Sequence, residues 1–157
     1  MTRVSGPPPP ARTDAPQPPF ATPEEAQDAY YAAFSATDVA AMAEVWGDDA
    51  DTLCIHPGGG LLKGKEAVMQ SWMEIFAGAQ PPSVEVEAVA ARDSGDLAIR
   101  VLVESIRPNG RPTESVSKVL ATNVFRLEDG SWRLVQHHAS LPLRVAPSAS
   151  IAKHRVH

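Results

Sequence analysis

The 157-residue sequence predicts an α+β domain in which three helices precede an antiparallel sheet. Apolar residues recur with helical spacing up to about residue 77 and alternate with polar residues from residue 83 onward. Helices followed by a run of strands are typical of α+β folds, in which the helices pack on one face of the sheet. The length fits one domain, and 43% hydrophobic residues are enough to form its core.

The first helix is predicted to begin at the segment 22–25, Thr-Pro-Glu-Glu. A threonine cap, a proline at the first helical position and a glutamate three residues after the cap together form a capping box. The apolar residues that follow recur at helical spacing and form one face. These residues are Ala26, Ala29, Tyr30, Ala33 and Phe34.

Two shorter helical segments follow the first helix. Asp38 is expected to cap a short helix that ends near Trp46, because aspartate accepts hydrogen bonds from the first turn. A third helix is predicted from about Lys65 to Ala77. Gly78 is placed to end it, since glycine readily adopts the left-handed conformation found after helices.

The strands are predicted from alternation and from turn sequences. A short strand is expected over residues 51–56, where Pro57 and three glycines stop it. Longer strands follow, separated by turn sequences such as Asp129-Gly130. They run from residue 83 to a turn at 93–96, then over 97–106, 115–127 and 132–139.

Both ends of the chain are expected to lie outside the folded domain. Seven of the 15 prolines fall within residues 1–20, and proline lacks the backbone donor that helices and sheets need. We therefore expect a disordered, proline-rich arm over residues 1–20. The folded domain is then expected over 21–145, and a short C-terminal tail over 146–157.

Charge and composition argue against several classes of protein. The chain has 14 basic and 19 acidic residues, a net charge of −5, whereas nucleic-acid binding depends on a basic surface. No stretch approaches the roughly 18 consecutive apolar residues of a membrane-spanning helix. The single cysteine, Cys54, cannot form an internal disulfide and is typical of a reducing compartment. We expect a cytoplasmic protein that binds neither nucleic acid nor membranes.

A family resemblance rests on six segments of the chain. They are 30–38 (YYAAFSATD), 46–50 (WGDDA), 54–58 (CIHPG), 64–68 (GKEAV), 125–132 (FRLEDGSW) and 137–140 (HHAS). In order and spacing they resemble the SnoaL-like branch of the nuclear transport factor 2-like superfamily. The resemblance covers residues 21–143. It implies a cystatin-like cone, with a curved antiparallel sheet around three helices, that usually pairs through its sheet as a homodimer.

Resemblance to the ketosteroid isomerases of this superfamily implies three candidate catalytic residues. In those enzymes a tyrosine and an acid form an oxyanion hole, and a carboxylate before a proline acts as the base. The matching positions here are Tyr30 for the tyrosine, Asn123 for the acid and His56 for the base. Histidine keeps the capacity of a base near neutral pH, because its ordinary pKa is about 6.5. Asparagine is a weaker donor than a protonated acid, which favours a smaller carbonyl or enol substrate than a steroid.

Each of these three residues also has a structural interpretation. His56 would close a strand, and Tyr30 would anchor its hydroxyl in the core. Asn123 would make a structural hydrogen bond, because burying its amide without a partner costs about 1–3 kcal/mol.

Further residues are expected to line the interior of the cone as a ligand pocket. They are Phe34, Trp46, Cys54, Trp72, Phe76, Val101, Val103, Phe125 and His137. His137 and His138 are neighbours on one strand, so their rings point to opposite faces and cannot share a metal. The resemblance places His137, Val135 and Ala139 toward the cavity and His138 outside with Trp132, an assignment that a bulge would reverse. By alternation, an apolar outer face for the homodimer is expected from Leu102, Val124, Trp132 and Leu134.

Three functions remain open from the sequence. The first is a cofactor-independent isomerase, lyase or cyclase acting on a small apolar carbonyl compound, with His56 as the base. The second is a non-catalytic protein that binds a small ligand in the same cavity, and the third is a dimerisation or association module. The histidines and acids lack metal-ligand spacing, so neither a metal nor another cofactor is expected.

Overall fold

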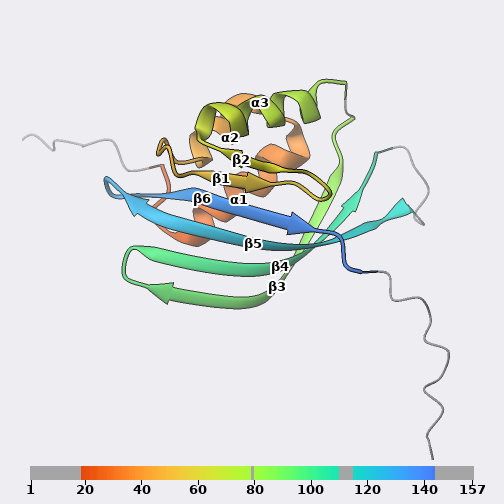
Figure 1. Ribbon diagram of the computed structural model, residues 1–157. Coiled ribbons are helices and arrows are strands. Elements are labelled where there is room, and N and C mark those ends of the chain that lie inside the picture. Colours follow the sequence, from red (N-terminus) through yellow and green to blue (C-terminus); the bar gives the residue numbers. More distant parts are fainter. Residues whose placement is uncertain (1–18, 79, 110–114, 144–157) are drawn as a thin grey trace, which may run out of the picture.

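The computed structural model describes residues 19–78, 80–109 and 115–143. Within these residues, three helices lie on one face of a six-stranded sheet (Figure 1). The predicted α+β class and the order of helices before strands are confirmed. The proline-rich arm lies outside the described residues up to residue 18, and so does the whole tail predicted over 146–157.

The helices begin where the capping residues predict. Thr22 accepts a hydrogen bond from the backbone N–H of Glu25 at 3.1 Å, and Asp38 caps the second helix in the same way. Gly64, with a φ of 85°, precedes the third helix, which has no side-chain cap. The helices are α1 (Pro23–Ala36), α2 (Val39–Val45) and α3 (Lys65–Phe76). In the described part of the chain, no helix is both long and apolar enough to cross a membrane.

The sheet is mixed rather than wholly antiparallel. Its strands lie in the order β2-β1-β6-β5-β4-β3, and β1 runs parallel to β6 while all other neighbours are antiparallel. The sequence predicted β1 but not β2, because three residues after a run of glycines show no alternation. The strands are β1 (Leu53–Ile55), β2 (Leu61–Lys63), β3 (Ser83–Ser94), β4 (Leu97–Arg107), β5 (Ser117–Glu128) and β6 (Ser131–Ser140).

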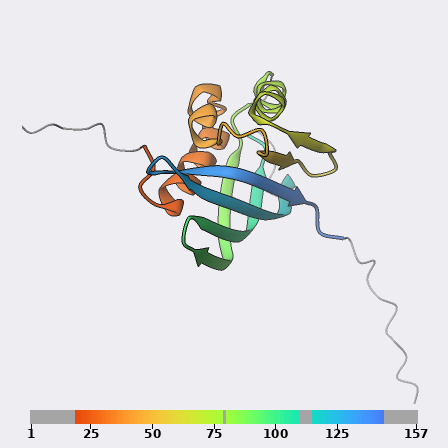
Figure 2. The same ribbon diagram turned by 60° about the vertical axis from the view of Figure 1, so that its left-hand side comes forward.

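The long strands bend around the helices. In Figure 1 the right-hand ends of β3, β4 and β5 rise toward α3, and Figure 2 shows the helices gathered on the same side of the sheet. Register shifts interrupt β3 at Ala88/Ala90 and the β5–β6 pair at Val124/Phe125. Bulges of this kind increase the local twist of a sheet.

The core between helices and sheet includes one residue assigned to the arm. Phe20 is 8% exposed and belongs to the main hydrophobic cluster. Its carbonyl accepts a hydrogen bond from the backbone N–H of Trp132 at 2.9 Å. The predicted arm boundary at residue 20 is therefore wrong. Phe20 belongs to the domain because it can bury an aromatic ring, which the prolines before it cannot do.

The two faces of β4 were predicted the wrong way round. Leu102 is 1% exposed in the core, with Arg100 and Glu104 buried on the same side, so its predicted place on the outer face is wrong. Val101 and Val103 lie on the opposite face and are half-buried. They do not line the interior. Both faces of β4 carry apolar residues. The charges of Arg100 and Glu104 therefore favoured the prediction that their face is exposed to solvent.

A bulge in β6 accounts for a second error. Val124 pairs with Gln136 but Phe125 pairs with Leu134, which makes Val135 an extra residue. One extra residue exchanges the two faces of a strand beyond the bulge.

The predicted faces of β6 are correct after the bulge and wrong before it. After it, His137 and Ala139 are buried and His138 is exposed, as predicted. Before it, Leu134 is fully buried and Trp132 packs against the core, so their predicted place on the outer face is wrong.

Candidate functional site

A cavity of two adjoining chambers lies between the helices and the sheet. The inner chamber has a volume of about 120 Å³ and the outer one about 410 Å³, and they share Phe34, Ile75 and Ile106 as walls. The outer chamber lies where α1, α3 and β4 end. The apolar walls of the inner chamber are Phe34, Pro57, Trp72, Ile75, Ile106 and Ala139, and its polar walls are His56, Glu104 and His137.

Two of the polar wall residues are joined by a buried chain of hydrogen bonds. The Tyr31 hydroxyl donates to Glu104 Oε1 at 2.7 Å, and Asn123 Nδ2 donates to the Tyr31 oxygen at 3.0 Å. Asn123 Oδ1 lies 2.6 Å from His137 Nδ1. An amide oxygen only accepts, so His137 Nδ1 carries the proton and donates. His137 Nε2 is then an unprotonated acceptor.

Burial favours the neutral forms along this chain. It raises the pKa of Glu104, although the hydrogen bond from Tyr31 acts in the opposite direction. It also raises the pKa of Tyr31 far above its ordinary value, and the nearby Glu104 carboxylate adds to that effect. Burial lowers the pKa of His137 to about 3, with smaller contributions from His56 and His138. His137 is therefore neutral at physiological pH.

The third polar wall residue, His56, is held in one tautomer by α3. Its Nε2 lies 2.9 Å from Ser71 Oγ, and that hydroxyl donates its only proton to the carbonyl of Val68 at 2.6 Å. Ser71 must therefore accept from His56 Nε2–H, which leaves Nδ1 unprotonated. The ring packs edge-on against Trp72, with centroids 5.0 Å apart. Burial lowers the pKa of His56, so its neutral, basic form predominates at neutral pH.

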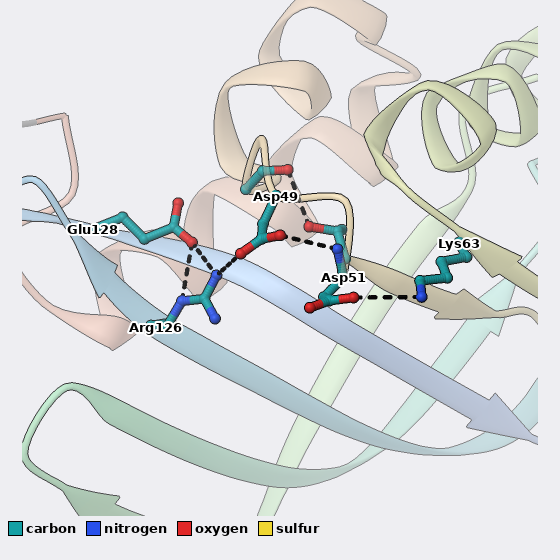
Figure 3. Close-up of polar contacts among 7 residues, drawn as sticks. Asp49, Asp51, Lys63, Arg126 and Glu128 are labelled. Atoms are coloured by element: carbon teal, nitrogen blue, oxygen red, sulfur yellow. Dashed lines mark hydrogen bonds and ion pairs between the residues drawn. The ribbon is translucent and has the colours of Figure 1, made fainter.

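Ion pairs fix the loop that leads into β1 and so toward His56. Figure 3 shows Arg126 of β5 between Asp49, at 2.8 Å, and Glu128, at 2.7 Å. Asp51 in the same loop lies 3.4 Å from Lys63 of β2. Each exposed pair contributes little alone, but together they attach the loop to two strands.

Residues 24–144 match the sequence profile of the SnoaL-like domain. The chain belongs to the SnoaL-like family. The match covers all nine helices and strands of the described part. The resemblance predicted from the six segments is thus confirmed, together with the nuclear transport factor 2-like (NTF2-like) superfamily to which it points.

Known relatives of this SnoaL-like protein differ in what they are assigned to do. A structure from Thiobacillus denitrificans, assigned as a calcium/calmodulin-dependent protein kinase type II association domain, is 38% identical with a TM-score of 0.75. The match covers 81% of this chain and 100% of that one. An NTF2-like protein from Streptomyces avermitilis, assigned as a dehydratase, is 31% identical with a TM-score of 0.69, covering 75% and 91%.

A plant protein is also similar. F-box protein SKIP8 of Arabidopsis thaliana is 34% identical over 103 residues, which are 66% of this chain. The matched segment spans 42% of the plant protein, less than half of its length.

In this SnoaL-like domain, the tyrosine of α1 that contacts Asn123 is Tyr31 and not Tyr30, to which the resemblance pointed. Tyr30 is fully buried behind the inner chamber, and its hydroxyl has no hydrogen-bond partner among the described residues. Its ring packs against Tyr31, Trp46 and Trp72. Tyr31 is the tyrosine whose hydroxyl reaches Asn123, which is itself fully buried and links the chain rather than lining the chamber.

The predicted pocket residues separate into wall and core. Trp72 and His137 line the inner chamber, Phe76 lines the outer one, and Phe34 lines both. Three others lie fully buried in the core and line neither chamber: Trp46, Cys54 and Phe125.

Cys54 lies beside the site without taking part in it. Its sulfur is 3.6 Å from His56 Nε2, but burial raises the pKa of its thiol to about 12. A thiol of this kind is not a nucleophile at neutral pH. Across the described residues, no group of three or more His, Cys, Asp or Glu side chains is arranged to hold a metal.

Sequence reasoning missed Glu104, Tyr31 and Ser71. Glu104 was missed because it shares a face of β4 with Arg100 and Leu102, and that face was predicted to be the outer one. Ser71 had no detectable signal, since its role depends on the approach of His56 from a distant loop.

Proposed function

We propose that this SnoaL-like protein is a cofactor-independent acid–base enzyme acting on a small, apolar carbonyl compound bound in the cavity. One observation carries the proposal: His56 and Glu104 line the same apolar chamber, and burial shifts their pKa values toward each other. In both cases burial favours the neutral form, in which a histidine can accept a proton and a carboxyl group can donate one.

The proposed chemistry uses these two groups in fixed roles. The Glu104 carboxylic acid donates a hydrogen bond to the substrate carbonyl oxygen, while Tyr31 orients the carboxyl group. His56 Nδ1 removes a proton from the carbon next to the carbonyl, the electron pair of that C–H bond becomes the C=C bond of an enol, and Glu104 transfers its proton to the carbonyl oxygen. Where the substrate carries a C=C bond one carbon further on, His56 returns its proton to the far carbon of that bond while the enol proton returns to Glu104, which gives the conjugated isomer. The apolar walls exclude water, which strengthens both hydrogen bonds.

The relatives support an enzyme and a second candidate function. The 31% identical relative assigned as a dehydratase favours acid–base chemistry, because dehydration also requires a base and an acid. The 38% identical relative assigned as an association domain is matched over its full length, which favours an assembly module. A module of this kind would need no turnover in the cavity.

Proton exchange distinguishes these functions. The exchange of acidic C–H protons with D2O is followed by NMR on a panel of small cyclic and aryl ketones. We expect His56→Ala to slow the exchange by about a hundredfold or more, the usual contribution of a general base. Glu104→Gln should slow it as well, because the amide keeps the hydrogen bond from Tyr31 but cannot transfer a proton.

The matched control is His138→Ala, which removes an exposed histidine from the other face of β6. It should leave the exchange rate unchanged. Ketones that bind without any enzyme-dependent exchange would contradict the catalytic proposal and leave the binding function. Absence of binding by every ketone would favour the association module.

A further inference from the structure

The two histidines of the inner chamber can only accept from a ligand, whereas Trp72, another wall residue, has a buried indole N–H without a partner among the described residues. His56 Nε2 and His137 Nδ1 are engaged with Ser71 and Asn123, so each ring presents its unprotonated nitrogen as the remaining polar atom. Glu104 Oε1 already accepts from Tyr31. Among the described residues that line the two chambers, none is a lysine or an arginine. The described walls therefore offer no counter-ion for a phosphate or carboxylate ligand.

His137 is the acceptor whose orientation the structure fixes most firmly. Asn123 does not line the cavity and His137 does, so the ring edge opposite Nδ1 faces the chamber. The residue is 2% exposed, and none of the described groups hydrogen-bonds to its Nε2. The Tyr30 ring lies 5.2 Å away, but its hydroxyl is itself unpartnered and does not occupy that nitrogen. An acceptor on the wall of a largely apolar chamber, with no hydrogen bond to the described residues, favours a ligand that donates to it.

We propose that His137 selects a hydroxyl group on the ligand by accepting its hydrogen bond at Nε2, and that the ligand is an uncharged hydroxy-carbonyl compound. This inference rests on the proposed function and names its substrate class. The carbonyl oxygen faces Glu104, the hydroxyl faces His137, and an apolar remainder occupies the outer chamber. An ammonium group is a poorer fit, because burial raises the pKa of Glu104 and so disfavours the charged form that would pair with it.

The low pKa of His137 supports this role independently of the geometry. Because the ring stays neutral, Nε2 remains an acceptor and cannot become a donor at physiological pH. A ligand with a carbonyl or ether oxygen at this position would place two acceptors against each other. Selection against such ligands is strong where a buried polar group is left unpaired.

The test compares three ligands on one skeleton: 3-hydroxy-1-indanone, 1-indanone and 3-methoxy-1-indanone. Calorimetry is done with the wild-type protein and with His56→Ala, in which turnover is blocked. We expect the hydroxy ketone to bind at least about tenfold more tightly than the other two. His137→Phe, which has no acceptor, should remove that preference, and His138→Phe, on the opposite face, should keep it.

A measurement on the unaltered protein covers the case in which His137→Phe does not fold. In ¹⁵N NMR, the Nε2 resonance of His137 should be that of an unprotonated nitrogen and should shift when the hydroxy ketone binds. Equal affinity for the three ligands, tighter binding of 1-aminoindane than of the hydroxy ketone, or an unchanged Nε2 resonance would overturn the inference. If the wild-type protein binds the hydroxy ketone preferentially but catalyses no proton exchange, only the catalytic proposal is refuted.

Discussion

Two adjacent tyrosine hydroxyls of α1 have opposite environments. The Tyr31 hydroxyl accepts from Asn123 and donates to Glu104, so both its lone pair and its proton are used. The Tyr30 hydroxyl is buried with no partner in the described part of the chain. A buried polar group without a partner loses its hydration and gains nothing in return.

The same substitution at the two positions should therefore have different effects. Tyr31→Phe should lower the free energy of unfolding by about 1–3 kcal/mol, because it leaves Asn123 and Glu104 unpaired. Tyr30→Phe should leave that free energy unchanged or raise it. Urea denaturation measures both, and each variant is the control for the other because the same oxygen is removed. Equal losses at the two positions would show that the hydrogen-bonded chain contributes nothing to stability.

The buried histidines make stability depend on pH. The pKa of His137 is about 3 in the folded protein and about 6.5 in an unfolded chain, so protonation favours unfolding. Its contribution is fully present above pH 6.5 and is lost as the pH falls toward 3. His56 acts in the same direction, since burial lowers its pKa too. Glu104 opposes them above about pH 4.5, because burial raises its pKa and its protonated form favours the folded state.

We expect the free energy of unfolding to fall between pH 6.5 and 5, by up to about 1.4 kcal/mol per pH unit for His137, with His56 acting in the same direction. Glu104→Gln should make the loss steeper by removing the opposing group. Urea denaturation at several pH values measures both slopes, with His138→Gln as the control for an exposed histidine. A flat profile for Glu104→Gln would rule out a buried, neutral His137.

The sequence predicted some site residues and not others. His56 was identified because its place before Pro57 matches that of the base in the ketosteroid isomerases that the sequence resembles. The resemblance pointed to Tyr30, and local geometry does not separate it from Tyr31, since neighbours on a helix point about 100° apart and the apolar face is wide enough to include both. Only the approach of Asn123 from β5 determines which hydroxyl is used.

At the scale of elements, the helices were predictable and the faces of two strands were not. Capping residues are local, so Thr22 and Asp38 locate helix starts from sequence alone. The faces of β4 depend on remote partners. Arg100 is buried because it pairs with Asp93 of β3 and Glu24 of α1, and Glu104 is buried because it meets Tyr31. Charges with such partners break the rule that polar residues mark the exposed face.

The mixed sheet has a similar origin. β1 is short and joins the sheet beside β6, the last strand, so its parallel pairing depends on contacts about 80 residues away in sequence. The extra residue Val135 in β6 lies between Leu134, which packs in the core, and His137, which lines the cavity. Alternation over a few residues carries no information about either feature.

At the scale of the whole molecule, the three helices cover one face of the sheet and leave the other without a helix among the described elements (Figure 1). The corrected strand faces identify the apolar residues on this outer side. Val103 lies opposite Leu120, and Ile99 lies opposite Val124, across the β4–β5 pair. Leu120 is 46% exposed and Ile99 37%. Val101 lies between these pairs, so the patch is continuous.

We expect this patch to pair with the same patch of a second copy, which would make the protein a homodimer. Burying adjacent apolar side chains from both copies favours association, and a two-fold axis places the patch of one copy against the same patch of the other. Leu120→Lys should then dissociate the dimer, because it places a charge from each copy in the interface. The matched control is Leu61→Lys on the edge strand β2, where the leucine is also exposed. Sedimentation at micromolar concentration measures the mass. A wild-type species of 16.7 kDa, or equal dissociation by both variants, would exclude the outer face of the sheet as the dimer interface.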